Sequence, residues 1–176
     1  MNRFVAGICA ATLVASSGVV WAQEASDNRV AAKTDWSVFV EDSPTECWSV
    51  SSPKETVNTR DGRPVAVNRG DVLMFVAFRP GSDVSGEVSF TGGYEFREGS
   101  TVTVEISGSN FELFTDDNWA WPASPSDDAK IITAMKRGTQ AVVTGVSQRS
   151  GTTTRDTFSL LGFTAAMEEA EKRCTS

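Results

Sequence analysis

Apolar and polar residues alternate along much of this 176-residue chain, and this pattern limits the possible folds more than any other feature of the sequence. Every second residue of 101–106 is Val or Ile, which places the apolar side chains on one face of a strand. Residues 111–114 continue the alternation after a turn at 107–110, so the two segments are expected to form a hairpin. Such strands are typical of antiparallel sheets with one buried face.

Other segments of the chain also have the composition of strands. Residues 71–78 are almost continuously apolar, which is typical of a central strand covered on both faces. Residues 59–64, with Asp61-Gly62 and a proline, predict a turn or loop. The remaining predicted strands are 36–40, 47–50, 84–90, 139–146 and 152–161.

Two helices are expected late in the chain. Ser126 is expected to cap the first helix, which has Asp127 and Asp128 in its first turn and ends at Gly138. The second is expected to begin near Thr164. Its apolar residues recur at helical spacing and therefore form one face: Phe163, Met167, Ala170 and Cys174.

Composition excludes several classes of protein and of chemistry. Apolar residues make up 40% and charged residues 22% of the chain, which excludes a disordered chain and a polytopic membrane protein. The absence of histidine excludes Ser-His-Asp and Cys-His catalysis and imidazole zinc sites. A formal net charge of −7 argues against a nucleic-acid partner, which needs a concentrated basic face. We expect no cofactor and no metal site.

The first 22 residues have the pattern of a secretory signal peptide. A short positive start is followed by an apolar run at 4–20, and small or tolerated residues before Ala22 fit cleavage there. The alternative is an uncleaved anchor helix, for which the run is short. We therefore predict a signal peptide at 1–22, a flexible arm at 23–34 and one domain at 35–176. This domain would be periplasmic or associated with the outer envelope, without a transmembrane span.

Cleavage after Ala22 would remove Cys9 and leave Cys47 and Cys174 in the mature chain. Two distant cysteines in an exported protein indicate one disulfide. A catalytic thiol is the alternative, but it needs a base, and the chain contains no histidine. The disulfide would tie the C-terminal helix back to the sheet.

Several segments form a recognisable pattern when they are taken in order. They are Trp36-Ser37-Val38-Phe39 before Cys47, Gly93-Tyr94-Glu95-Phe96 with Gly99-Ser100, Phe111-Glu112-Leu113-Phe114 with Ala120-Trp121, Ala134-Met135-Lys136-Arg137-Gly138 followed by Ser147, Arg149 and Thr152–Thr154, and Asp156-Thr157-Phe158-Ser159-Leu160-Leu161-Gly162-Phe163 before Cys174. In these segments the chain resembles the invasion-associated locus B family of exported bacterial proteins. The resemblance implies an antiparallel β-sandwich-like domain in the periplasm or envelope, and links pathogenic members to host-cell invasion. It assigns no catalytic or binding residue.

Trp119 and Trp121 are two residues apart and therefore share one face of a strand. Such a pair more often closes the end of a core, but an exposed pair can stack on a sugar ring or bind a peptide. The neighbouring Asp116, Asp117 and Asn118 fit no EF-hand calcium loop and are expected to form a solvated turn.

The charged candidates are a basic set and three glutamates. The basic residues could converge on an anionic lipid head group, a glycan or an acidic partner, or could simply be solvated. The glutamates could supply the carboxylate pair of a glycan hydrolase. The basic set is Lys136, Arg137, Arg149 and Arg155, and the glutamates are Glu95, Glu105 and Glu112.

We therefore predict an exported, envelope-associated interaction protein without catalytic activity, which binds an unidentified envelope or host-surface protein or glycan. A small periplasmic glycan hydrolase and a carrier of a small ligand are the alternatives. The candidate binding surface comprises Trp119, Trp121 and the basic set.

Overall fold

The computed structural model describes residues 28–43 and 45–175. The predicted signal peptide and the start of the predicted arm lie outside these residues. Twelve antiparallel strands form one sheet in the order β1-β2-β3-β6-β7-β10-β9-β8-β11-β12-β4-β5. The elements are β1 (Arg29–Lys33), β2 (Trp36–Asp42), β3 (Thr45–Ser51), β4 (Glu55–Arg60), β5 (Arg63–Pro64), β6 (Leu73–Arg79), η1 (Pro80–Ser82), β7 (Val84–Thr91), β8 (Thr101–Ile106), β9 (Ser109–Asp116), β10 (Trp119–Trp121), α1 (Pro125–Arg137), β11 (Gln140–Val146), β12 (Thr153–Ser159) and α2 (Phe163–Cys174).

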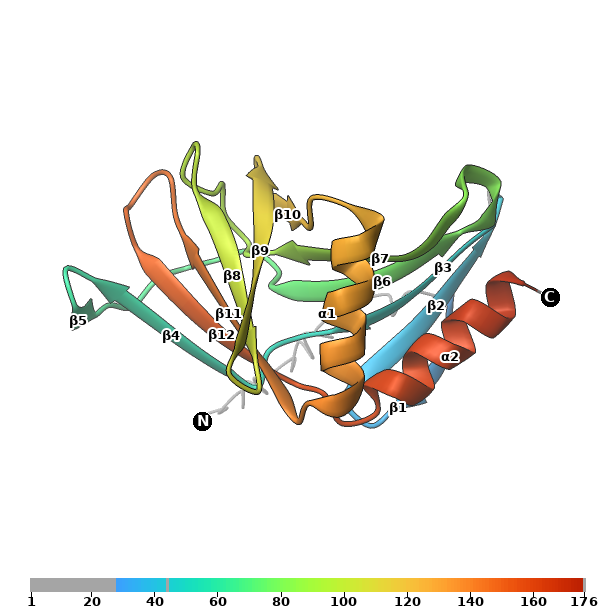
Figure 1. Ribbon diagram of the computed structural model, residues 1–176. Coiled ribbons are helices and arrows are strands. Elements are labelled where there is room, and N and C mark those ends of the chain that lie inside the picture. Colours follow the sequence, from blue (N-terminus) through green and yellow to red (C-terminus); the bar gives the residue numbers. More distant parts are fainter. Residues whose placement is uncertain (1–27, 44, 176) are drawn as a thin grey trace, which may run out of the picture.

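The sheet folds over so that its two halves face each other across one core (Figure 1). Strands β7 and β12 are separated in the sheet by four others, yet the rings of Phe90 and Phe158 lie 6.1 Å apart. Trp36 Nε1 in β2 also donates a hydrogen bond of 2.9 Å to the carbonyl of Ser159. The prediction of a mainly β, sandwich-like antiparallel domain with one internal and one C-terminal helix is confirmed.

The predicted hairpin is formed by β8 and β9. Ile106 pairs with Ser109, so the connection consists of Ser107 and Gly108 alone. Both residues have positive φ angles, 50° and 81°, as a two-residue turn that follows the right-handed strand twist requires. Leu113 and the three predicted apolar residues of β8 are buried in the core.

Strand β6 is central in the sheet, as predicted, but only one of its faces is fully covered. Met74, Val76 and Phe78 are buried, whereas the residues between them remain partly exposed. A continuously apolar strand therefore supplies the core with one face and leaves Phe75 on the outer face of the sheet.

Strands β1 and β4 were not predicted, and neither was the two-residue strand β5. The segment 59–64, predicted as a turn or loop, contains the end of β4 and the whole of β5, with the turn at Asp61 and Gly62 between them. Residues 29–33 form β1 and pair with β2, so the predicted flexible arm at 23–34 is wrong for these residues. Strand β4, Glu55–Arg60, pairs with β12 but exposes most of its side chains. Backbone pairing defines both strands, and neither needs the apolar period from which strands are predicted.

Helix α1 is capped by Ser124 rather than by Ser126. The Ser124 hydroxyl accepts a hydrogen bond from the Asp127 N–H, and Pro125 occupies the first turn, where its missing N–H has no cost. Asp128 does not face solvent. Its carboxylate is buried and accepts a 2.8 Å hydrogen bond from the backbone N–H of Val88, which joins the helix to β7.

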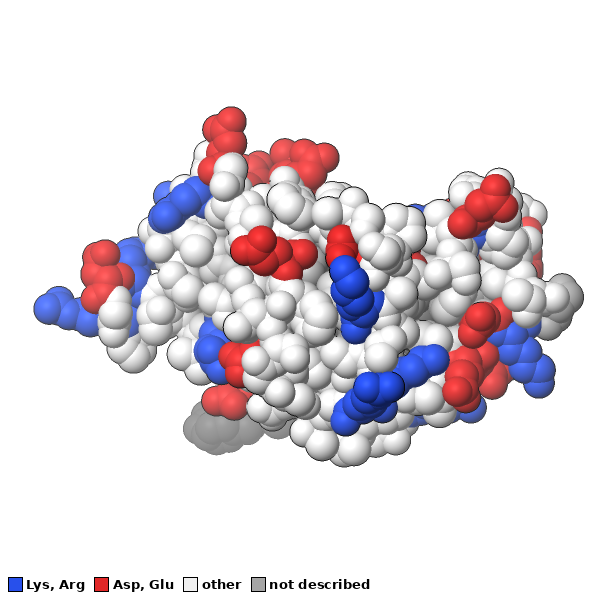
Figure 2. Space-filling view, in the orientation of Figure 1, with Lys and Arg blue, Asp and Glu red and all other residues white. Residues whose placement is uncertain are grey.

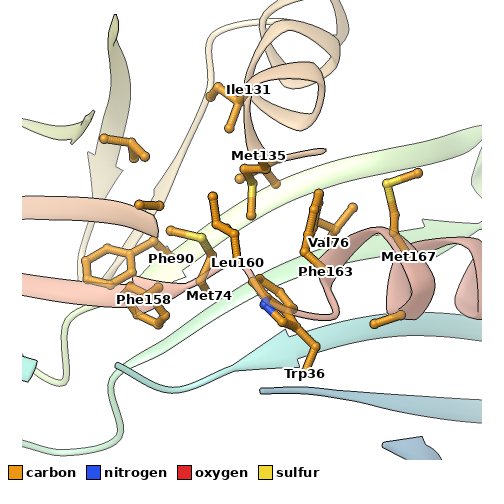
Figure 3. Close-up of a cluster of buried hydrophobic side chains, with 14 of the residues drawn as sticks. Trp36, Met74, Val76, Phe90, Ile131, Met135, Phe158, Leu160, Phe163 and Met167 are labelled. Atoms are coloured by element: carbon orange, nitrogen blue, oxygen red, sulfur yellow. The ribbon is translucent and has the colours of Figure 1, made fainter. Parts of the chain in front are cut away.

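Helix α2 buries the predicted face against the sheet, and side chains from both helices and from β2, β6, β7 and β12 enter one core (Figure 3). Gly162 precedes α2 with a φ of 87°, and a Cβ there would collide with the carbonyl of Lys33. The predicted disulfide joins Cys47 in β3 to Cys174 at the end of α2, with Cα atoms 5.8 Å apart.

Substitution of Cys47 by Ser in the mature protein should lower the free energy of unfolding by about 3–5 kcal/mol, because the bond closes a long loop in the unfolded chain. Urea unfolding would measure this loss, and reduction of the unsubstituted protein should reproduce it. Cys174 should then react with thiol reagents. Two reactive thiols in the native, oxidised protein would contradict the disulfide.

Burial raises the pKa of Asp128 above its ordinary value of 3.8. The folded state then holds this proton more tightly than the unfolded chain, so the contribution of Asp128 to stability falls as the pH rises from 3.8 through the folded-state pKa. Asp128→Asn removes the charge but keeps an acceptor for Val88, and should therefore gain stability relative to wild type as the pH rises from about 3.5 to about 7. Urea unfolding across this range tests the trend, which a pH-independent difference would contradict.

The matched variant Asp128→Ala removes the acceptor as well as the charge. It should be less stable than Asp128→Asn by about 1–3 kcal/mol, because the buried N–H of Val88 loses its partner.

Candidate functional site

Trp119 and Trp121 lie on the outer face of the sheet, because the residue between them, Ala120, is the one that enters the core. Their indole rings stack with centroids 6.1 Å apart and an interplanar angle of 21°. The ring of Phe75 lies 5.6 Å from Trp119, and Phe114, which pairs with Trp121 in the sheet, is 53% exposed. The interpretation that the tryptophans close the core is therefore wrong. We call these four residues the outer aromatic row.

A hollow of about 690 Å³ adjoins the outer aromatic row, and we call it the aromatic hollow. Phe75 and Trp119 belong to both features. The carboxylates around the hollow come from three different loops, which the fold brings to one end of the sheet. The lining consists of Gly70, Asp71, Leu73, Phe75, Thr91, Gly93, Tyr94, Glu95, Asp117, Asn118 and Trp119.

A second hollow, of about 740 Å³, lies on the other side of Tyr94 and Glu95, and we call it the basic hollow. Gly93, Tyr94 and Glu95 line both hollows, so they form the wall between them. The other residues of the basic hollow are Arg60, Ala66, Val67, Asn68, Ser147, Arg149 and Ser150.

A buried ion pair positions this wall. The guanidinium of Arg69 donates hydrogen bonds of 2.8 and 2.7 Å to the two carboxylate oxygens of Asp156, and the two side chains are 8% and 0% exposed. Arg69 also donates to the carbonyl of Gly92 at 2.9 Å, and its guanidinium lies 5.1 Å from the centre of the Tyr94 ring. The pair therefore links β12 to the loop that carries Tyr94.

Contacts of both its hydroxyl and its ring hold Tyr94 in place. Its hydroxyl lies 2.6 Å from the hydroxyl of Thr154 in β12, and its ring packs edge-on against Phe96. Burial raises the pKa of the Tyr94 phenol above its ordinary value of 10.0. The wall between the hollows is consequently a fixed aromatic surface.

Sequence reasoning did not identify Arg69, Tyr94 and Asp156 as a unit. Arg69 and Asp156 are 87 residues apart, and no local pattern relates them. One signal was available, since Asp156 occupies an inward position in the alternation of β12, where an acidic side chain needs a buried partner.

The predicted basic set does not converge. Lys136 and Arg137 end α1 just before β11, whereas Arg149 follows the far end of that strand, roughly 23 Å away by strand rise. Arg155 lies near Glu105, with a closest N–O distance of 3.9 Å. Of these four residues, Arg149 lines the basic hollow, together with Arg60, a residue that the sequence analysis did not select.

The three candidate glutamates are also separated. Glu95 lines both hollows at the wall, Glu105 lies beside Arg155, and Glu112 lines a different hollow near α1. Asp117 and Asn118 of the predicted turn border the aromatic hollow. Within 28–43 and 45–175, no group of three or more Asp, Glu or Cys side chains is placed to hold a metal ion.

The same part of the chain contains no helix with the length and apolar character that a membrane span requires.

Substitution of Asp156 by Ala should lower the free energy of unfolding by about 3–5 kcal/mol, because it leaves the Arg69 guanidinium buried without a counter-ion. The neighbouring Arg155→Ala is the matched control and should change stability by less than about 1 kcal/mol, since Arg155 is exposed. Chemical denaturation measures both. The double variant Arg69→Met, Asp156→Leu should lose less than the sum of its single variants, and strict additivity would contradict the coupling.

The sequence and the fold of the chain are similar to those of known proteins. The chain has no significant sequence match among curated proteins. Its fold is similar to the crystal structure of invasion associated protein B from Bartonella henselae, with a TM-score of 0.57, 13% identity, and coverage of 83% of this chain and 98% of that one. A family model described as invasion associated locus B (IalB) protein matches residues 41–171, which is most of the chain. The chain therefore belongs to the invasion associated locus B family.

Proposed function

We propose that this protein is an exported, envelope-associated interaction protein without catalytic activity, and that the outer aromatic row forms its binding surface. The observation that carries the proposal is the position of Trp119 and Trp121, which lie side by side on the outer face of the sheet rather than in the core. The partner would be a protein or glycan of the envelope or of a host surface.

The composition of the row supports recognition. Large aromatic side chains on a solvent-facing sheet have no role in the core of this domain, and Trp and Tyr dominate the energetics of protein interfaces. The stacked indoles and Phe75 form a continuous aromatic surface that ends in the aromatic hollow. A flat aromatic surface with carboxylates at one end suits an extended partner chain or a sugar ring.

The distribution of potential catalytic groups supports a role in binding rather than in chemistry. Glycoside hydrolysis needs two carboxyl groups that face each other across the substrate. Glu95, Glu105 and Glu112 occupy separate places, and the chain contains no histidine. The aromatic hollow is the feature that favours the alternative of a small-ligand carrier.

Export is supported by three observations. Residues 1–22 have the pattern of a signal peptide, and a disulfide between Cys47 and Cys174 is typical of an oxidising compartment. Membership in the locus B family agrees with both. The printed name of the Bartonella henselae neighbour associates that protein with invasion, and we extend to this chain only the idea of a surface or envelope partner.

The double variant Trp119→Ala, Trp121→Ala tests the proposed surface. Immobilised mature protein should retain a specific, saturable partner from solubilised cell envelopes, whereas the double variant should lose at least ten-fold in affinity, since aromatic anchors carry most of an interface's binding energy. Quantitative mass spectrometry of the captured fraction, followed by binding measurements with the purified partner, gives the affinities.

Trp48→Ala is the matched control. Trp48 stacks on Phe39 with centroids 5.9 Å apart and is also partly exposed, but it contacts neither Trp119 nor the aromatic hollow. It should bind the partner normally. Equal loss in Trp48→Ala, or unchanged binding in the folded double variant, would refute the proposed surface.

A further inference from the structure

We infer that the basic hollow binds an anionic saccharide, that is, a sugar that carries a carboxylate or a phosphate group. This site is separate from the outer aromatic row, so the inference does not depend on the proposed function. It is built by the end of β4, the nearby segment that precedes β6, and the turn between β11 and β12, which is distant from both in the sequence but adjacent to them in the fold.

Two guanidinium groups line the hollow without a carboxylate partner. The described acidic side chains form ion pairs with Arg69, Arg79, Arg155 and Arg173, but none lies within 4.0 Å of Arg60 or Arg149. A third guanidinium, that of Arg97, lies against Gly151 in the turn that carries Arg149. Three unneutralised cations thus gather around one turn.

Arg60 is held in place before any ligand binds. Its Nε and Nη2 atoms donate to the Thr152 hydroxyl at 3.3 and 2.9 Å, and Thr152 is only 1% exposed. Ser150 donates to the same hydroxyl oxygen at 2.9 Å. These bonds use two of the five N–H groups of the guanidinium and leave the others to bind an oxyanion in bidentate geometry.

The remaining lining suits a sugar. Asn68, Ser147 and Ser150 offer amide and hydroxyl groups, and Glu95 can accept hydrogen bonds from sugar hydroxyls. The fixed ring of Tyr94 provides an aromatic wall. A volume of about 740 Å³ lies within the usual range of small-molecule sites and accommodates one or two sugar rings.

Charge distribution favours a small anionic ligand over a polyanionic surface. The whole chain has a formal charge of −7, which repels an anionic membrane or a nucleic acid. Figure 2 shows basic and acidic side chains interspersed over much of the face in view, with one small group of adjoining basic side chains at its lower centre. Glu95 in the wall adds negative charge at the edge of the hollow. The guanidinium groups of Arg60 and Arg149 are exposed, so a ligand that enters the hollow can reach both.

Two-dimensional NMR titration of the isotope-labelled mature protein tests the inference. The probes are D-glucuronate, glucose 6-phosphate, neutral glucose, inorganic phosphate and phosphatidylglycerol vesicles. At least one acidic sugar should cause saturable shifts at residues 60 and 147–152 and bind more than ten-fold more tightly than glucose or inorganic phosphate. Arg60→Ala and Arg149→Ala should each weaken this binding at least ten-fold.

Arg155→Ala is the matched control, because it removes the same charge from an exposed arginine outside the hollow. It should bind the acidic sugar normally, as should the double variant Trp119→Ala, Trp121→Ala, whose behaviour separates this inference from the proposed function. If Arg60→Ala fails to fold, sugar binding by Arg149→Ala tests the inference instead. Arg149 is exposed in a turn, so its substitution should leave the fold intact.

The inference is overturned by any of five results. These are the absence of saturable binding by both acidic sugars, equal binding of inorganic phosphate or glucose, unchanged binding in Arg149→Ala, equal weakening in Arg155→Ala, and binding of vesicles without binding of either acidic sugar.

Discussion

The buried ion pair between Arg69 and Asp156 is the interaction on which the end of the domain with the two hollows depends. It is bidentate, almost inaccessible to solvent, and joins a segment between β5 and β6 to the middle of β12. An unpaired charge at this depth would cost several kcal/mol, so the two residues constrain each other. Through Gly92 and Tyr94, the pair also fixes the wall that separates the aromatic and basic hollows.

The opposite end of the domain is held by covalent and apolar contacts. The disulfide joins Cys47 to Cys174, while Trp36 packs edge-on against Phe163 with ring centroids 4.9 Å apart. These contacts clamp α2 onto the first strands of the sheet. A polar anchor at one end and a disulfide-linked helix at the other hold a single folded-over sheet in shape, and its outer face and end loops remain available for recognition.

The outer face of the sheet and the basic hollow differ in chemical character, although they lie close together. The alternation of β6 gives the core one set of apolar residues and the outer surface Phe75, which extends the stacked tryptophans of β10. On the other side of Tyr94, Arg60 and Arg149 face the basic hollow. The aromatic hollow and the basic hollow thus share one rigid wall.

The sequence alone determined the features that depend on local periodicity: the β8–β9 hairpin, the buried face of α2, the mainly β class and, through cysteine number and export, the disulfide. It also carried the family resemblance, which the family match confirms. Strands β1 and β4 escaped prediction because backbone pairing, and not an apolar period, defines them. Only the tertiary structure decided that Trp119 and Trp121 face outward, that Asp156 meets Arg69, and that Arg60 and Arg149 line one hollow. The physical reason is that a strand's period shows that two faces exist, whereas which face is buried and which distant charge lies opposite depend on how the sheet folds over.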